Sequence, residues 1–209
     1  MIISLTGFMG CGKSSVGREL SKLLCCRFMD LDDVIVERVG RSIPEIFADE
    51  GEKVFRQMEL EALTDVVSEG WSKTKSLPRL RRGPLPFTRP RAATVFDTPP
   101  AYNTLSHTLS EERTQDVVVV ALGGGAVMTK ECAEIVKERT TCVYLKASIE
   151  TLHEHLEGQT DNRPLLNSRN RIAELMALRA ETYEKTAHVV IDTDGKSIEA
   201  IASEIISNL

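Results

Sequence analysis

The sequence predicts a three-layer α/β/α fold, in which a parallel sheet is covered by helices on both faces. Three observations support this prediction. Short apolar segments alternate with longer amphipathic segments along most of the chain. Val117-Val118-Val119-Val120 is an uninterrupted apolar run, as in a strand that is buried on both faces. A glycine-rich loop connects the first apolar segment to the first helical one.

The elements follow from these patterns in chain order. Strands are expected where short apolar or β-branched runs occur, at 1–6, 27–31, 117–122, 141–145 and 188–192. Helical patterns separate or follow them at 14–24, 51–67, 130–139, 149–156, 169–186 and 197–207. Because strands and helices alternate, the strands should run parallel.

The composition is that of one globular domain. Of the 209 residues, 42% are hydrophobic and 27% are charged, which is ordinary for such a protein. There is no apolar run of membrane-spanning length and no leader before the first strand, so we expect no membrane association and a cytoplasmic location. The five cysteines show no metal-ligand spacing and are typical of a reducing compartment. The net charge of −5 gives no reason to expect nucleic-acid binding.

Segment 72–110 interrupts the alternation of strands and helices. It contains six prolines. It also contains seven lysines and arginines and only one acidic residue, Asp97, so its local net charge is +6. No amphipathic period continues through it. We interpret it as an inserted loop that contributes little to the core. The alternative is a basic docking segment for an acidic partner.

Residues 7–14 read G-F-M-G-C-G-K-S, the G-x-x-x-x-G-K-[ST] pattern of a phosphate-binding P-loop. Glycines let successive backbone N–H groups point at phosphate oxygens, and the helix N-terminus adds its positive end. We therefore expect Lys13 at the β- and γ-phosphates and the Ser14 hydroxyl at Mg²⁺. A chance glycine-rich turn is the alternative, which the strand and helix on its flanks disfavour.

Two charged pairs could serve a phosphoryl acceptor. Asp30 and Asp32 end the second predicted strand, and on extended backbone they point to the same side. One carboxylate could support Mg²⁺ and the other could accept a hydroxyl proton; a strand end that meets solvent is the alternative. Arg56 and Glu59 lie three residues apart on a helix and share a face. Their alternative is an exposed ion pair of little energetic worth.

Three further features lie in the second half of the chain. Gly123-Gly124-Gly125 follows the buried strand and would let a ligand approach the backbone closely. Asn162-Arg163-Pro164-Leu165-Leu166 lies in a polar stretch at 157–171, which we interpret as a mobile lid whose arginine suits a γ-phosphate. Arg179 and Tyr183 lie one turn apart on the helix before the last strand, and singly they are ordinary helix-surface residues.

Taken in order, these motifs resemble the signature set of the shikimate kinase family. The matching patterns are G-F-M-G-x-G-K-S, D-x-D, F-R-x-x-E, G-G-G, R-P-L-L and R-x-x-x-Y. Residues 42–47 and 51–52 match the family's linking segment as well. The resemblance covers residues 1–69 and 116–209, nearly everything outside the proposed insert.

The resemblance implies a nucleoside-monophosphate-kinase-like sheet of five parallel strands in the order 2-3-1-4-5. It implies transfer of the γ-phosphate of ATP, with Mg²⁺, to the 3-hydroxyl of shikimate in aromatic amino-acid biosynthesis. The implied nucleotide site comprises Gly7, Gly10, Cys11, Gly12, Lys13, Ser14, Ser15 and Arg163, with Ser14 and Asp30 at the metal. The implied shikimate site comprises Asp32, Arg56, Glu59, Gly124, Gly125 and Arg179. Asp32 is the implied base, and Lys13 and Arg163 assist catalysis.

The chemistry of the residues agrees with a small hydroxylated carboxylate, because guanidinium groups bind a carboxylate through two parallel hydrogen bonds. Two alternatives stay open. Another small-molecule P-loop kinase, such as a gluconate-type enzyme, would lack paired arginines placed for a carboxylate. A non-catalytic relative would be expected to have lost Lys13, Asp32 or Arg163, and all three are present.

The insert is the largest departure from the family pattern, and two smaller ones are visible. Cys11 stands where the family usually has serine, alanine or threonine. His153-Glu154-His155 stands where an arginine commonly stacks on adenine, so the residues that contact adenine are not predicted.

Shikimate is the expected small-molecule partner, and the expected oligomeric state is a monomer.

Overall fold

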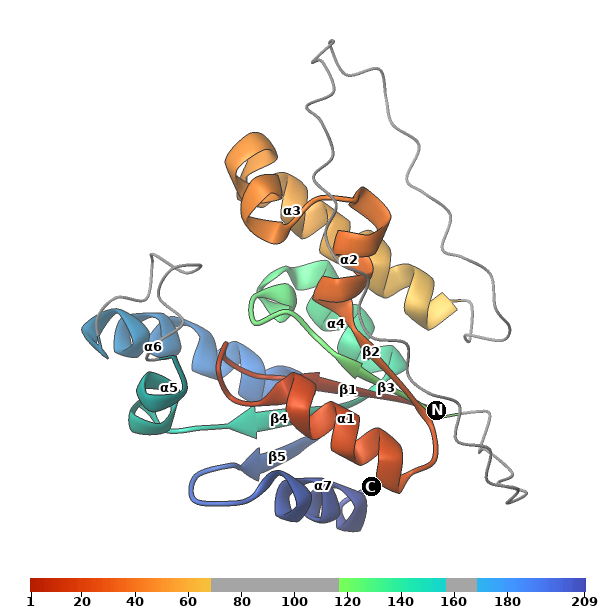
Figure 1. Ribbon diagram of the computed structural model, residues 1–209, viewed down its shortest axis with the longest axis vertical. Helices are drawn as coiled ribbons and strands as arrows, with labels where there is room; N and C mark the ends of the chain where they lie inside the picture. Colours follow the sequence, from red (N-terminus) through yellow and green to blue (C-terminus); the bar gives the residue numbers. More distant parts are fainter. Residues whose placement is uncertain (69–116, 157–168) are drawn as a thin grey trace, which may run out of the picture.

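The computed structural model describes residues 1–68, 117–156 and 169–209. Its centre is a five-stranded sheet in the order β2-β3-β1-β4-β5, and every pair of neighbours is parallel (Figure 1). The strands are β1 (Ile2–Thr6), β2 (Arg27–Asp30), β3 (Val118–Ala121), β4 (Thr141–Lys146) and β5 (Val189–Asp192). The predicted sheet and its strand order are confirmed.

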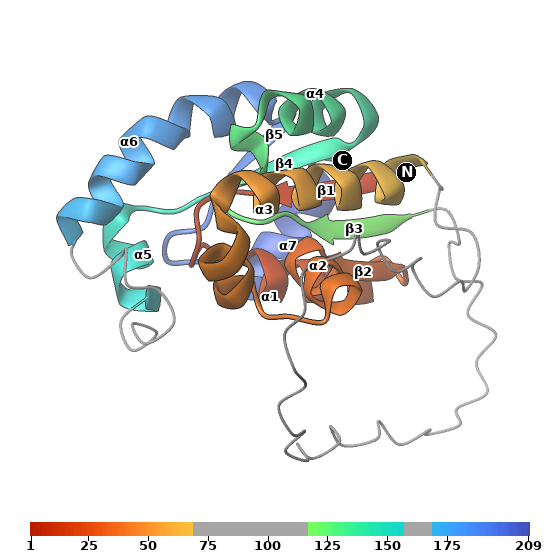
Figure 2. The ribbon, with the colours of Figure 1, turned by 90° about the horizontal axis from the view of Figure 1, so that it is seen from above.

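Helices cover both faces of this sheet, as the alternation predicted. They are α1 (Lys13–Leu23), α2 (Leu31–Val39), α3 (Ile43–Ser68), α4 (Lys130–Arg139), α5 (Ile149–Leu156), α6 (Arg169–Thr186) and α7 (Ile198–Ser207), with a 3₁₀ turn, η1 (Ala126–Met128). Seen from above, α1 and α7 lie together on one face, while α4 and α6 lie on the other (Figure 2). None of the helices in the described ranges is both long and apolar enough to cross a membrane.

The core lies between the central strands and these two helical layers. Ile3, Leu5, Val119, Val143 and Leu145 have no exposed surface. Full burial of a side chain of this size stabilises the fold by about 1.5–3 kcal/mol. The central strands are therefore a rigid platform, and the loops at their carboxyl ends inherit a fixed position.

The prediction for the Asp30–Asp32 segment was wrong in its local geometry. The strand ends at Asp30, and Asp32 lies in the first turn of α2 rather than on extended backbone. The cause is a helix cap, because the Asp30 side chain accepts a hydrogen bond from the Asp32 backbone N–H at 3.1 Å. Helix α2 itself was not predicted.

Helix α3 begins earlier than predicted, at Ile43 instead of residue 51. At this start the Glu45 carboxylate reaches back to Ser42 and accepts hydrogen bonds from its N–H and its hydroxyl, both at 2.8 Å, which is one half of a capping box. Gly51 has a positive φ of 79° and separates two helical halves. The second half corresponds to the predicted helix and carries Arg56 and Glu59.

The described segments that flank the proposed insert, the end of α3 and the start of β3, lie away from the phosphate-binding loop. Helix α3 ends at Ser68, and β3 begins beside the chain's first residue, where the Val118 N–H donates to the Met1 carbonyl at 3.0 Å. In Figures 1 and 2 the end of α3 and the start of β3 lie on the same side of the molecule as the N-terminus. Segment 72–110 and Arg163 fall outside the described residues, as does most of the predicted lid.

Candidate active site

The phosphate-binding loop follows β1 and opens α1, as its sequence pattern predicted. Gly12 caps the helix with φ +87°, a left-handed conformation that favours glycine. The Lys13 ammonium donates hydrogen bonds to the carbonyls of Gly7 at 3.0 Å and Phe8 at 2.9 Å, so it is folded back over the loop. This places a positive charge and the N-terminus of α1 at one spot, which suits a phosphate group.

A hydroxyl and a carboxylate lie together at the start of α1. Ser14 Oγ donates to Asp30 Oδ2 at 2.5 Å, which joins the P-loop to the end of β2. Both groups offer hard oxygen ligands, and Mg²⁺ usually takes only one or two ligands from the protein beside phosphate oxygens and water. The pair therefore fits the cation, although the described residues contain no cluster of three or more histidines, cysteines and carboxylates that could hold a metal alone.

Gly123-Gly124-Gly125, directly after β3, forms a floor on which three charged side chains pack. A Cβ atom at Gly123 would lie 2.5 Å from Glu59 Oε1 and 2.8 Å from Asp32 Oδ1. A Cβ atom at Gly125 would overlap the Arg56 guanidinium. The absence of side chains here lets α2 and α3 bring these groups onto the end of β3.

The same floor touches the P-loop and α6. A Cβ atom at Gly124 would lie 3.1 Å from the backbone nitrogen of Met9, and the Gly124 carbonyl accepts a hydrogen bond from the Tyr183 hydroxyl at 2.5 Å. Tyr183 is fully buried, so it is not the ordinary surface residue that its sequence suggested. It fixes the turn of α6 that carries Arg179.

The two predicted arginines differ in their contacts. Arg56 donates to Glu59 Oε2 at 2.5 Å and to Glu52 Oε1 at 2.8 Å, and its side chain is 19% exposed. Arg179 lies over the Phe8 ring, with 5.8 Å between the guanidinium carbon and the ring centroid. Its Nη1 atom is buried and has no hydrogen-bond acceptor among the described residues. A buried donor of this kind is suited to an incoming acceptor such as a carboxylate.

Glu59 is a buried carboxyl at the centre of this cluster and is 1% exposed. Burial raises its pKa to about 6, the Arg56 guanidinium opposes this rise, and the Asp32 carboxylate adds to it. When Glu59 is charged, it forms an ion pair with Arg56, and this pair holds the Arg56 guanidinium in place.

This pKa makes the stability of the protein depend on pH in a defined direction. Between about pH 4.5 and 6 folded Glu59 keeps a proton that the unfolded chain loses, so the free energy of unfolding falls as the pH rises through this window. The expected loss is about 2 kcal/mol relative to Glu59→Gln, which cannot titrate. Urea unfolding of both proteins from pH 4 to 7.5 measures it. Glu61→Gln on the same helix is the control, and a wild-type/Glu59→Gln difference that stays constant with pH would contradict the assignment.

A cavity of about 830 Å³ opens over the P-loop and extends toward the carboxyl end of β5. This volume suits a ligand of nucleotide size. Its walls are Met9, Gly10, Cys11, Gly12, Lys13, Ser14, Ser15, Val16, Asp30, Asp32, Leu122, Gly124, His155, Thr193, Lys196, Ser197, Ile198, Glu199 and Ile201. Of the described residues predicted for the nucleotide site, all except Gly7 line it.

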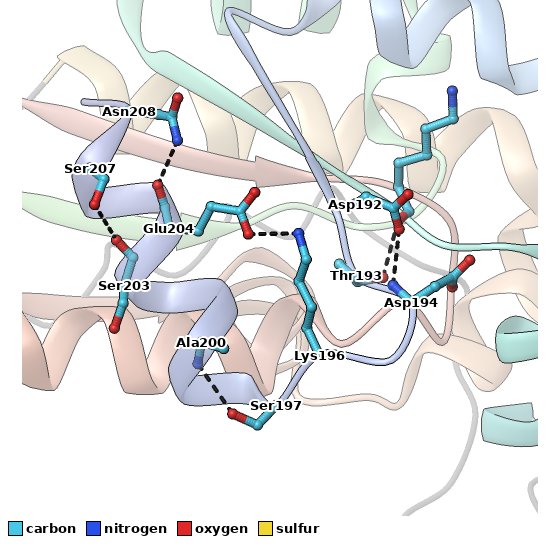
Figure 3. A network of polar contacts seen from close by, with 11 residues as sticks. Asp192, Thr193, Asp194, Lys196, Ser197, Ala200, Ser203, Glu204, Ser207 and Asn208 are labelled. Carbon is cyan, nitrogen blue, oxygen red and sulfur yellow. Dashed lines mark hydrogen bonds and ion pairs between the residues drawn. The ribbon is translucent and has the colours of Figure 1, made fainter.

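The far wall of this cavity was missed by sequence reasoning. It is the loop between β5 and α7, drawn in Figure 3, where Thr193 donates from its N–H to the Lys146 carbonyl at 2.8 Å and Lys196 pairs with Glu204 at 2.6 Å. Ser197 caps α7 by accepting from the Ala200 N–H at 3.2 Å. A usable signal existed, because the loop follows the carboxyl end of a parallel strand, where ligands bind in such folds.

The parallel sheet and the P-loop, with its adjacent serine–aspartate pair, define a P-loop kinase of the nucleoside-monophosphate-kinase type. The family model described as shikimate kinase matches residues 9–73 and 101–209. The chain belongs to the shikimate kinase family.

Individual relatives agree with this family assignment. A shikimate kinase from Thermus thermophilus is 34% identical over 99% of this chain and 89% of its own length, and one from Geobacter metallireducens is 37% identical over 99% and 90%. Among solved structures, shikimate kinase from Acinetobacter baumannii in complex with shikimate has a TM-score of 0.72 and 27% identity, covering 99% of this chain and 91% of that one. Shikimate kinase from Aquifex aeolicus has a TM-score of 0.68 and 26% identity, covering 99% and 95%.

Proposed function

We propose that this protein transfers the γ-phosphate of ATP to the 3-hydroxyl of shikimate, giving shikimate 3-phosphate in the route to aromatic amino acids. The observation that supports this most is the convergence of Asp32, Arg56 and Glu59 on the glycine floor directly beside the P-loop. A phosphate donor on one side and a site for a small hydroxylated carboxylate on the other is what this reaction requires. The family assignment points to the same acceptor.

The proposed roles of the described residues are argued from the positions of their side chains. Lys13 and the N–H groups of the P-loop bind the phosphates, and Asp32 accepts the proton of the attacking hydroxyl. Arg56 and Arg179 bind the shikimate carboxylate, and Glu59 holds Arg56 in place. Ser14 and Asp30 would hold Mg²⁺, and the cation would supply positive charge for the transferred phosphate. Arg163, which lies outside the described residues, is proposed to contact the phosphates.

A coupled assay of ADP release, run with and without shikimate, tests the proposal. The expected result is Mg²⁺-dependent ADP release that requires shikimate and is absent with gluconate. Release with gluconate instead would favour another small-molecule kinase. Nucleotide binding with no turnover of any acceptor would favour a non-catalytic relative.

We also propose that residues 1–209 form one domain, located in the cytoplasm and active as a monomer, with 72–110 as an insert and 157–171 as a lid. The family model leaves 74–100 unmatched, and the described ends next to the insert lie at the edge of the sheet opposite the P-loop.

Replacing 72–110 with a short glycine/serine linker tests the insert. Shikimate turnover should stay within a few-fold of wild type, because the flanking ends are far from the site, and loop closure changes by only about 0.6 kcal/mol for each halving of loop length. A matched variant with 72–110 in scrambled order controls for length. If the deletion variant folds but its shikimate turnover falls more than tenfold, the proposal is wrong. It is also wrong if the deletion variant does not fold.

A further inference from the structure

The last turn of α5 holds the P-loop at Gly10 through two contacts. His155 Nδ1 lies 2.8 Å from the Gly10 carbonyl oxygen, and since a carbonyl only accepts, the imidazole donates this hydrogen bond. Leu156, the next residue, packs so closely that a Cβ atom at Gly10 would lie 3.0 Å from its Cγ. The carbonyl and Cα of one P-loop glycine are thus held by consecutive residues of another helix.

His155 is also part of the nucleotide cavity. It is exposed and lines that cavity together with the P-loop and the β5–α7 loop. A hydrogen bond from the Ser148 backbone N–H lowers the pKa of the Asp194 carboxyl, and the charge of His155 makes a smaller contribution in the same direction. The imidazole therefore contacts the P-loop at Gly10 and shares the cavity with the β5–α7 loop.

We propose that His155 is a positioning residue that sets the affinity of the P-loop for the nucleotide and makes this affinity depend on pH. The inference rests on the proposed function for the identity of the nucleotide. A neutral imidazole with its proton on Nδ1 can make the bond to Gly10, and so can an imidazolium. Only the imidazolium adds a positive charge at the cavity, where an anionic nucleotide binds. Histidine gains this charge between about pH 5 and 8.

Other charged groups around the cavity set the background for this effect. The P-loop contributes Lys13, β2 contributes Asp30, and the β5–α7 loop contributes Asp194 and Lys196. Asp32 and Glu199 also line the cavity, and α6, which packs on α5, carries the ion pair of Arg171 and Glu174 near its start. These groups are the same in every variant below, so comparison at equal pH removes their contribution.

Two substitutions change the charge at this position while keeping a hydrogen-bond donor. His155→Gln keeps a donor but is neutral at every pH, and His155→Arg keeps a donor and is always charged. His153→Gln is the matched control, because His153 lies on the same helix but outside the lining of the cavity. The measurement is the Kd of Mg·ADP by titration calorimetry on the full chain at pH 5.5, 6.5, 7.5 and 8.5.

At pH 5.5 wild type should bind ADP roughly threefold to tenfold more tightly than His155→Gln, as expected for one partly exposed charge near an anion. By pH 8.5 the two should be equal, while His155→Arg should stay tighter at every pH. His153→Gln should match wild type throughout. A ratio of wild type to His155→Gln that does not change with pH would overturn the proposal, as would the same pH-dependent change in His153→Gln.

The readout is independent of the acceptor. ADP binding needs no shikimate, so failure of shikimate turnover would count against the proposed function and leave the histidine result intact. Conversely, a flat ADP profile with normal turnover would count against His155 alone. Shikimate affinity in the absence of nucleotide should be unchanged in all variants, which checks that the substitutions leave the fold intact.

Discussion

Asp32→Asn should lower kcat by roughly 10²–10⁴-fold, the usual contribution of a general base. The variant keeps the shape of the side chain but can no longer take a proton from the shikimate hydroxyl. Asp32 is held in the first turn of α2 by the cap from Asp30, and its Oδ1 packs against Gly123 beside Glu59. Steady-state kinetics with saturating ATP and shikimate measure the loss.

The Kd for ATP should change little in Asp32→Asn, because the P-loop contacts are retained. Asp33→Asn is the matched control: Asp33 is the next residue of the same helix and is exposed. It should keep wild-type kcat. If Asp32→Asn kept kcat within threefold of wild type, Asp32 would not be the base. An equal loss in both variants would point instead to a general effect on α2.

The fold could be predicted well from the sequence because its strongest signals are local. Continuous apolar runs specify buried strands, and the pattern of Gly7–Ser14 places a glycine-rich loop between the first strand and the first helix. Helix α2 was missed because its start is set by one capping hydrogen bond at Asp30, directly after a strand, with no break in the apolar pattern. The S-x-x-E pattern at Ser42–Glu45 is the local signal in the sequence for the start of α3.

The motifs predicted which residues should share a site, but not the geometry that brings them together. Motif spacing identified Asp32, Arg56 and Glu59, yet their convergence depends on how α2 and α3 pack against the end of β3, which no local pattern contains. The role of Tyr183 depends on its contact with Gly124, which is 59 residues away in the sequence. The role of His155 depends on its contact with Gly10, which is 145 residues away. Such pairs become visible only when the tertiary structure brings them together.

Arg56→Ala and Arg179→Ala should each weaken shikimate binding by roughly 10- to 150-fold, since a charge-assisted hydrogen bond to a carboxylate is worth about 1.5–3 kcal/mol. ATP affinity should change far less.

The two variants should differ in the free energy of unfolding. Removing Arg56 leaves the buried Glu59 without its guanidinium partner and should destabilise the fold. Removing Arg179 leaves no buried carboxylate without a partner and deletes an Nη1 that has no acceptor among the described residues, so it should cost less.

Methyl shikimate separates carboxylate binding from a general distortion of the site. Because the ester lacks the anion, it should bind wild type poorly and lose little more in either variant. Arg171→Ala, on the same helix as Arg179 but half-exposed and paired with Glu174, is the matched control and should bind shikimate normally. Normal shikimate affinity in both arginine variants would show that the carboxylate is held elsewhere. An equal loss for shikimate and its ester would show that the arginines shape the site without contacting the carboxylate.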